Sequence, residues 1–324
     1  MKALCVFSGG LDSMLAVQLV RAQGVQVQPV FFETPFFEPS RAARSAGTLG
    51  LTLKVVDITT RHFQIVKSPR HGYGANMNPC IDCHSLMVRV AGEMLASEGA
   101  DFVITGEVLG QRPMSQNRRG LDLVVAESGI GGLLVRPLSA KLLPPTIPEQ
   151  KGWLDRARLC AIEGRSRRTQ IEMAAEFSID NYPTPAGGCL LTEHGFSRRL
   201  RDLLETNSEP RREDLKMLRF GRYFRLAAGV RLIVGRNKKE NEALSDLSTV
   251  EDTVLSASGI PGPTAILSGP AGPGELETAL AVTLAYSDSH GLEKWPVTVL
   301  RAEGKIEVST PVTDKKAFSE LLIS

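Results

Sequence analysis

One stretch near the N-terminus constrains the fold more than any other, because an apolar run leads through a glycine-containing turn into a helical pattern. Residues 3–7 are typical of a buried strand and residues 13–23 of a helix. The turn between them reads SGGLDS at residues 8–13. Unpaired N–H groups and the positive end of the helix dipole meet at such a turn, which therefore favours binding of an anion.

The residue types in this turn suit a phosphate with a bound cation. Gly9 and Gly10 let the backbone approach a phosphate closely, and the hydroxyls of Ser8 and Ser13 can donate hydrogen bonds. Asp12 can hold a metal ion against the phosphate. No lysine follows the glycines, so the turn is not a Walker P-loop. An ordinary glycine-rich turn between a strand and a helix is the alternative.

The turn resembles the SGGxDS motif of the PP-loop ATP pyrophosphatases. These enzymes cleave ATP between the α- and β-phosphates and adenylate a substrate oxygen. The resemblance implies ATP and Mg²⁺ as ligands. It also implies an α/β fold of the adenine nucleotide alpha hydrolase-like type, with a parallel sheet and helices on both faces.

The first half of the chain alternates strand and helix patterns, which predicts parallel βαβ units. Ligands of such sheets lie at the C-terminal ends of the strands. The family resemblance places the adenosine at the end of the second strand, against backbone groups near Phe32, whereas we expect the side chains of Phe31 and Phe32 to pack in the core. Further strands are expected at 26–32, 51–56 and 102–105, and helices at 39–49, 85–96 and within 150–177.

Two cysteines precede the expected helix at 85–96, in the segment NPCIDCH. Cys80 and Cys83 lie where a loop enters a helix, and a helix N-terminus lowers the pKa of a thiol. In the cytosol a CxxC pair indicates metal, cluster or redox chemistry more often than a structural disulfide. Cys5 in the first strand and Cys160 on an expected helix at 154–162 are interpreted as packing residues.

The segment TGEVLGQRPMSQ follows the strand at 102–105 and resembles the TGxSLGQxxSQ stretch of the tRNA 4-thiouridine synthetases. The NPCxxC segment resembles the tRNA 2-thiouridylases instead. Both families activate a tRNA uridine with ATP and replace its oxygen by sulfur. The resemblance covers residues 1–190 and implies nucleotide contacts by Gly106 and Gln111. This sequence has one extra residue between Gln111 and Ser115. Residues 135–138 (VRPL) resemble the RPL segment of the 4-thiouridine enzymes, but the lysine that normally follows this segment is displaced here, and Lys141 is the nearest candidate.

A third cysteine, Cys189, ends the Pro/Gly-rich loop at 182–192, and a stiff loop can deliver one thiol to a site built elsewhere. We expect Cys189 to meet Cys80 and Cys83 above the ATP turn. Three interpretations stay open: a [4Fe–4S] cluster with one open iron, which a third cysteine favours; persulfide transfer with a resolving cysteine; and a structural zinc site, which usually has four ligands and could be completed by His84.

The second half carries a concentration of basic residues. Residues 196–239 contain 13 Lys and Arg against 5 Asp and Glu, a local net charge of +8, while the whole chain has +2. This asymmetry indicates an anionic partner such as RNA, although a solvated helix face is the alternative. The string GVRLIVGRNKKENEAL resembles the NFACT-R RNA-binding module. The sequence thus predicts a PP-loop domain at 1–195 and a smaller α+β RNA-binding domain at 196–324.

Together these patterns predict an ATP-dependent tRNA sulfurtransferase, with tRNA as substrate and either a desulfurase or free sulfide as sulfur donor. A zinc-containing PP-loop amide or nitrile synthetase and a non-catalytic RNA-binding protein are the alternatives. No apolar run spans a membrane and no signal peptide is visible, so we expect a cytoplasmic protein. The oligomeric state stays open, a homodimer included. The residues expected to bind nucleotide are Ser8, Gly9, Gly10, Leu11, Asp12, Ser13, Phe32, Gly106 and Gln111, and those expected to carry the chemistry are Asp12, Cys80, Cys83 and Cys189.

Overall fold

A computed structural model of the chain describes residues 1–183, 189–289 and 291–323. The chain divides into two compact units, Met1–Thr192 and Glu193–Ser324. This division lies close to the boundary at 195/196 that the sequence predicts. Within the described ranges, no helix has the length and apolar character needed to cross a membrane.

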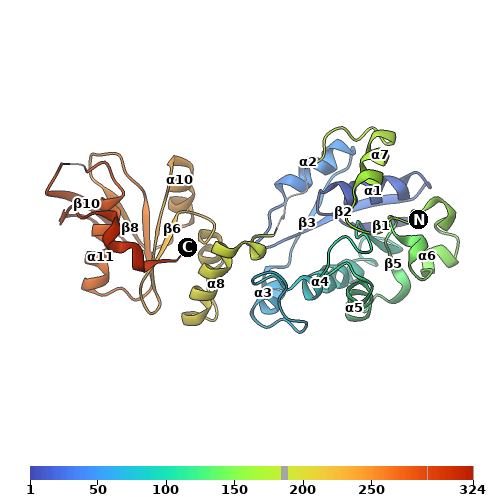
Figure 1. Ribbon diagram of the computed structural model, residues 1–324, viewed down its shortest axis with the longest axis horizontal. Coiled ribbons are helices and arrows are strands. Elements are labelled where there is room, and N and C mark those ends of the chain that lie inside the picture. The colour runs from blue at the N-terminus through green and yellow to red at the C-terminus, as the bar shows by residue number, and fades with distance from the viewer. Residues whose placement is uncertain (184–188, 290, 324) are drawn as a thin grey trace. The chain divides into compact units, whose positions relative to one another are not determined.

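Unit 1 is built on a five-stranded parallel sheet in the order β3-β2-β1-β4-β5, which confirms the predicted fold (Figure 1). The strands are β1 (Lys2–Val6), β2 (Gln26–Glu33), β3 (Lys54–Asp57), β4 (Phe102–Thr105) and β5 (Leu134–Val135). The α-helices are α1 (Leu11–Arg21), α2 (Ser40–Thr48), α3 (Thr59–Lys67), α4 (Cys80–Glu93), α5 (Arg118–Ser128), α6 (Ile147–Gln150) and α7 (Arg168–Glu176). Short 3₁₀ turns are η1 (Gly131–Leu133), η2 (Ala140–Leu142), η3 (Arg156–Arg158) and η4 (Leu190–Thr192).

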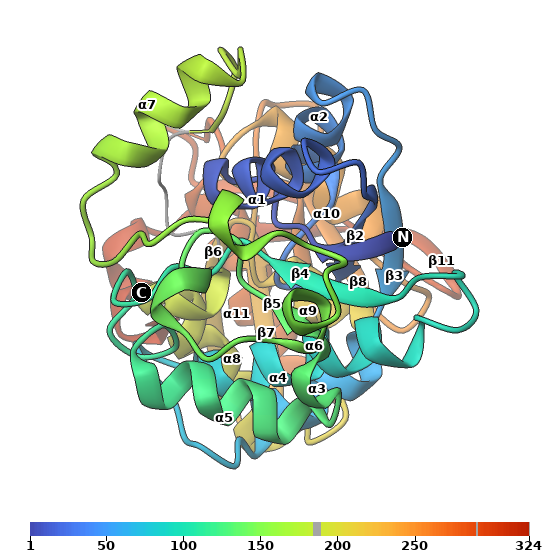
Figure 2. The same ribbon diagram turned by 90° about the vertical axis from the view of Figure 1, so that its right-hand side faces the viewer.

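Helices cover both faces of this sheet, because strand side chains point alternately to opposite sides. Cys5 and Phe31 face a core shared with α1, α2 and α7, whereas Leu4 and Phe32 face a second core shared with α4 and α5. Figure 2 shows α1, α2 and α7 on one side of the strands and α4 and α5 on the other. Cys5 is fully buried, as expected of a packing residue.

Part of the secondary structure predicted within 150–177 is wrong. The segment around Cys160 is irregular, and only α6, η3 and α7 are helical there. Leu159 and Ile162 are buried because the segment runs beside residues 137–141: Cys160 N–H bonds Pro137 O at 2.9 Å and Ile162 N–H bonds Leu138 O at 2.8 Å. The apolar spacing thus reflects this backbone pairing. Two helices, α3 and α5, were not predicted.

Unit 2 contains a seven-stranded antiparallel sheet in the order β11-β10-β8-β9-β7-β6-β12. Apolar residues of α11 pack on one face of it. One hairpin turns at Gly229, and a second pair of antiparallel strands is joined around Gly304. The strands are β6 (Arg222–Ala227), β7 (Val230–Val234), β8 (Thr253–Ala257), β9 (Ala265–Ser268), β10 (Lys294–Arg301), β11 (Gly304–Pro311) and β12 (Leu322–Ile323). The helices are α8 (His194–Thr206), α9 (Arg212–Met217), α10 (Lys238–Leu247), α11 (Pro273–Ala285) and the 3₁₀ turn η5 (Lys315–Leu321).

Candidate active site

The turn between β1 and α1 is held in place by its own hydroxyl groups. Ser13 Oγ donates to Gly10 O at 2.7 Å, and Ser8 Oγ accepts from Gly10 N–H at 3.3 Å. Ser45 of α2 donates to Gly9 O at 2.8 Å. The turn is therefore formed before any ligand arrives, with the first N–H groups of α1 left for an anion.

Gly9 and Gly106 are glycines for steric reasons. Gly9 has φ +74°, and a Cβ there would lie 2.6 Å from Ala42 Cα. A Cβ on Gly106, which follows β4, would lie 2.5 Å from Ser13 N in the first turn of α1. The absence of a side chain at Gly106 thus lets the end of β4 lie directly against the nucleotide turn.

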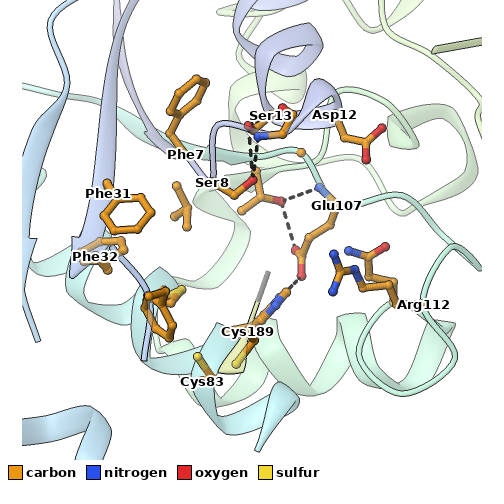
Figure 3. Close-up of a pocket in the computed structure, with 18 of the residues that line it drawn as sticks. Phe7, Ser8, Asp12, Ser13, Phe31, Phe32, Cys83, Glu107, Arg112 and Cys189 are labelled. Atoms are coloured by element: carbon orange, nitrogen blue, oxygen red, sulfur yellow. Dashed lines mark hydrogen bonds and ion pairs between the residues drawn. The ribbon is translucent and has the colours of Figure 1, made fainter. Parts of the chain in front are cut away.

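A cavity of about 650 Å³ opens at this edge of the sheet and contains both predicted groups of functional residues (Figure 3). Its volume suits a nucleotide-sized ligand. Gly9 is outside its lining, where it supports the turn against α2. The predicted residues that line the cavity are Ser8, Gly10, Leu11, Asp12, Ser13, Phe32, Cys80, Cys83, Gly106, Gln111 and Cys189.

Asp12 lies in the first turn of α1 with one oxygen paired and one free. Its Oδ2 accepts from Arg167 Nη2 at 2.8 Å and from Gln111 Nε2 at 3.3 Å. Its Oδ1 is buried and has no hydrogen-bond partner among the described residues. An unpaired carboxylate oxygen beside a phosphate-binding turn fits Mg²⁺, which binds through one or two carboxylates and the substrate phosphates.

A polar cluster around Glu107, which was not predicted from the sequence, lines part of the cavity. Glu107 Oε2 accepts from Arg136 Nε at 2.8 Å and from Thr105 Oγ1 at 3.0 Å, and Glu107 Oε1 lies 2.8 Å from His84 Nδ1. Burial alone would raise the pKa of Glu107, but Arg136 and His84 outweigh it and hold this pKa below its usual value. Glu107 is a polar residue just after a parallel strand, a position that could have pointed to the site.

The three predicted cysteines come together from two segments. Cys80 and Cys83 lie in the first turn of α4. Cys189 is brought to them because Met77 N–H bonds Leu191 O at 3.1 Å and Asn76 Nδ2 bonds Thr192 O at 2.7 Å. Residues 184–188 of the predicted Pro/Gly-rich loop lie outside the described residues.

The expectation that the helix N-terminus lowers the thiol pKa is wrong. Burial raises the pKa of Cys80 and, more strongly, that of Cys83, while it raises the pKa of Cys189 to about 11. The charge of Arg112 offsets part of this effect at Cys80 and Cys189. Desolvation thus outweighs the helix N-terminus, and the three groups favour the neutral thiol.

The sulfur donors that face the cavity are the thiols of Cys80, Cys83 and Cys189. In the described part of the chain, no three His, Cys, Asp or Glu side chains are grouped closely enough to hold a metal ion. The three thiols nevertheless face one cavity and interact electrostatically with one another. His84 also faces the cavity, with its Nδ1 on Glu107. A set of three soft sulfur donors matches the ligand preference of an iron–sulfur cluster.

Many basic side chains of the segment 196–239 form ion pairs or hydrogen bonds within unit 2. The net charge of +8 therefore overstates the positive charge that is available to a partner. Arg225 pairs with Asp202 at 2.9 Å and Arg231 with Asp214 at 2.6 Å. Arg199 donates instead to backbone carbonyls, and Arg211 bridges several acidic side chains. Within the described residues, three exposed basic side chains of the segment 196–239 make no ion pair or hydrogen bond: Arg198, Arg201 and Lys239.

The GRN motif of unit 2 builds a turn. Arg236 pairs with Glu240 at 2.6 Å, and Asn237 Oδ1 caps α10 by accepting from Glu240 N–H at 3.0 Å. A Cβ on Gly235 would lie 2.1 Å from Asn241 Oδ1, so a larger residue there would displace the side chain of Asn241. The conspicuous residues of the motif therefore shape the loop between β7 and α10.

Two family models match separate parts of the chain. Residues 1–141 match the thiamine biosynthesis protein (ThiI) family, and residues 221–320 match the NFACT protein RNA binding domain. Both matches confirm the resemblances found in the sequence.

Each of three curated relatives matches less than half of the chain. A "Probable tRNA sulfurtransferase" of Caldanaerobacter subterraneus is 31% identical over 147 residues, which are 42% of this chain and 36% of the relative. Another of Methanosarcina mazei is 34% identical over 118 residues (34% and 29%). A "tRNA-specific 2-thiouridylase MnmA" of Sulfurimonas denitrificans is 30% identical over 120 residues (33% and 35%). The chain thus spans about a third of the length of these relatives.

One solved structure, a predicted subunit of tRNA methyltransferase from Methanocaldococcus jannaschii, aligns over 42% of this chain and 67% of its own at 15% identity and a TM-score of 0.32, too low to inform the fold. The family matches and the geometry of unit 1 agree on one assignment. The chain thus joins a part that is similar to the ThiI family to a C-terminal part that is similar to the NFACT RNA-binding domain.

Proposed function

We propose that the protein is an ATP-dependent tRNA sulfurtransferase of the cytoplasm, which adenylates a uridine oxygen and replaces it with sulfur. The observation that carries this proposal is the shared cavity: the PP-loop and the cysteines Cys80, Cys83 and Cys189 line the same space. An activated base held at the phosphate turn would thus lie within reach of a sulfur held by the thiols. The names of the relatives and the RNA-binding type of the second domain support tRNA as substrate.

In the activation step, the uridine oxygen attacks the α-phosphorus of ATP and pyrophosphate leaves. Such catalysis depends mostly on positioning and on neutralisation of phosphate charge. The N–H groups at the start of α1 and the hydroxyl of Ser8 would bind the phosphates. Asp12 would hold Mg²⁺ through Oδ1, and the ion would supply positive charge beside the phosphates.

In the second step, sulfur attacks the adenylated carbon and AMP leaves. Cys80, Cys83 and Cys189 would hold a [4Fe–4S] cluster, which when bound supplies one iron without a protein ligand for sulfide. In the alternative without a cluster, one cysteine carries a persulfide and a second forms a disulfide with it as sulfur is released, so that a thiol reductant must restore the pair.

The NFACT-type domain would bind the tRNA backbone. Arg198, Arg201 and Lys239 are exposed, unpaired cations of the basic segment 196–239, and each phosphate contact releases counterions. We therefore expect tRNA binding to weaken steeply as the salt concentration rises.

The test is formation of AMP and pyrophosphate from ATP in the presence of sulfide, with and without transcribed tRNA. AMP should form only with tRNA, and Asp12→Asn should abolish it. Asp122→Asn, on the exposed side of α5, is the matched control and should leave the rate unchanged. AMP formation that needs a small carboxylic acid and ignores tRNA would contradict the proposal and favour an amide or nitrile synthetase.

A further inference from the structure

The turn at residues 8–13, which would bind the phosphates, contains no basic residue. The turn at residues 8–13 has one charged side chain, Asp12, although it must receive an anionic phosphate chain. Lys141, the nearest counterpart of the displaced family lysine, is exposed and lies outside the cavity lining. Any basic side chain that adds to the charge of a bound Mg²⁺ beside Asp12 must therefore come from another part of the chain.

Arg167 lies at this place. Its Nη2 is 2.8 Å from Asp12 Oδ2, and both side chains are largely buried. Arg165, two residues earlier, lines the same cavity, whereas the side chain of Arg168 is 87% exposed and pairs with Glu172. The chain thus presents Arg165 and Arg167 to the cavity and Arg168 to solvent.

The segment that carries Arg167 is anchored on both sides. Before it, Gly164 N–H bonds Leu109 O at 2.7 Å, next to the loop that contains Gln111. After it, α7 begins at Arg168 and packs into the same core as α1. These contacts hold Arg167 against the first turn of α1.

Arg167 has donors left after it pairs with Asp12. A guanidinium group has five N–H donors, and the contact with Asp12 is the one hydrogen bond that the Arg167 side chain makes among the described residues. Figure 3 shows Asp12 and Phe32 on opposite sides of the cavity, so Asp12 marks the end away from β2, where the adenosine is expected. The spare donors therefore face the end that would receive the outer phosphates.

We propose that Arg167 binds the β- and γ-phosphates of ATP, and thus the pyrophosphate that leaves, while Asp12 sets the orientation of its guanidinium group. This inference rests on the proposed nucleotide site and adds to it a residue from outside the PP-loop. A planar guanidinium suits phosphate oxygens because it donates two parallel hydrogen bonds.

The experiment is calorimetric binding of ATP, pyrophosphate and AMP to the full chain with Mg²⁺ present. Arg167→Gln should weaken binding of ATP and of pyrophosphate about 10- to 100-fold, the effect of losing charge-assisted hydrogen bonds, and leave AMP binding unchanged. Arg168→Gln, the matched exposed neighbour, should change none of the three. Arg167→Lys should restore part of the affinity, because it keeps the charge without the planar group.

The outcomes separate the inference from the proposed function. If the wild-type protein binds no ATP, the nucleotide site itself is wrong. If the wild type binds ATP and Arg167→Gln binds it equally well, or loses ATP and AMP to the same extent, Arg167 is only a structural partner of Asp12 and the inference is overturned. A thermal melt of Arg167→Gln, expected to match that of the wild type, checks that the variant is folded.

Discussion

The buried pair of Glu107 and Arg136 allows a quantitative test of the electrostatics beneath the cavity. The side chains of both residues are 5% exposed, and their closest contact is 2.8 Å. The variant Arg136→Met removes the guanidinium and leaves the carboxylate with only Thr105 and His84. Breaking a buried ion pair in this way costs about 3–5 kcal/mol of unfolding free energy, because one charge stays buried without compensation.

The loss should depend on pH in a defined direction. Arg136 is the largest of the influences that lower the pKa of Glu107, so this pKa rises in the variant. Protonation then relieves the uncompensated charge. The stability difference between wild type and Arg136→Met should therefore be greatest near pH 7 and shrink as the pH falls toward about 4.

Unfolding by urea would measure these effects. Trp153 packs against Phe102 in the core of unit 1, and Trp295 is the other tryptophan of the chain, so a Trp295→Phe background makes fluorescence report on unit 1. In the double variant with Glu107→Gln, the loss should be smaller than the sum of the two single losses by at least about 2 kcal/mol. Additive losses, or a penalty that does not change with pH, would refute the reasoning.

Three further predictions concern the nucleotide turn and the cysteines. Gly106→Ala should destabilise unit 1 by about 1–3 kcal/mol in the same urea titrations, because its Cβ meets backbone atoms of α1. The control Gly47→Ala lies within α2 with open space around it and should be neutral or stabilising by up to about 1 kcal/mol, so equal effects of the two variants would contradict the steric argument. Burial raises the pKa of the Cys189 thiol from 9.0 to about 11. In protein freed of metal, iodoacetamide should therefore alkylate Cys189 about 100-fold more slowly at neutral pH than an unburied cysteine, and the rate should rise up to about pH 11. Mass spectrometry would measure these rates, and a plateau near pH 9 would contradict the prediction. Protein purified without oxygen should contain about four irons and four sulfides per chain, lost in Cys189→Ala and kept in Cys160→Ala, whereas metal-free protein that still thiolates tRNA would leave the persulfide route.

The parts of the site that could be predicted from the sequence are those whose residues lie close together along the chain. The turn at 8–13 carries its glycines, hydroxyls and carboxylate in one motif, and Cys80 and Cys83 stand one helical turn apart. The parallel sheet followed from alternating strand and helix patterns. The approach of Cys189 was predicted from resemblance, while its cause, the hydrogen bonds to residues 76–77, is visible only in the structure.

The parts that were missed depend on the path of the chain in three dimensions. Arg167 and Asp12 are 155 positions apart, and no local pattern links them. Glu107 and Arg136 meet because β4 and β5 are neighbours in the sheet. The expected helix around Cys160 was wrong because backbone pairing with residues 137–141 buries the same apolar residues. The thiol pKa was misjudged because burial of a side chain cannot be seen in the sequence.

The central claim is that one cavity both activates a tRNA uridine and delivers sulfur to it. Its most direct test is nucleoside mass spectrometry of transcribed tRNA after incubation with the protein, ATP and sulfide. The account predicts a thiouridine that forms only with ATP, disappears in Asp12→Asn and Cys189→Ala, and persists in Cys160→Ala. Sulfur incorporation without ATP, or with Cys189 absent, would contradict it.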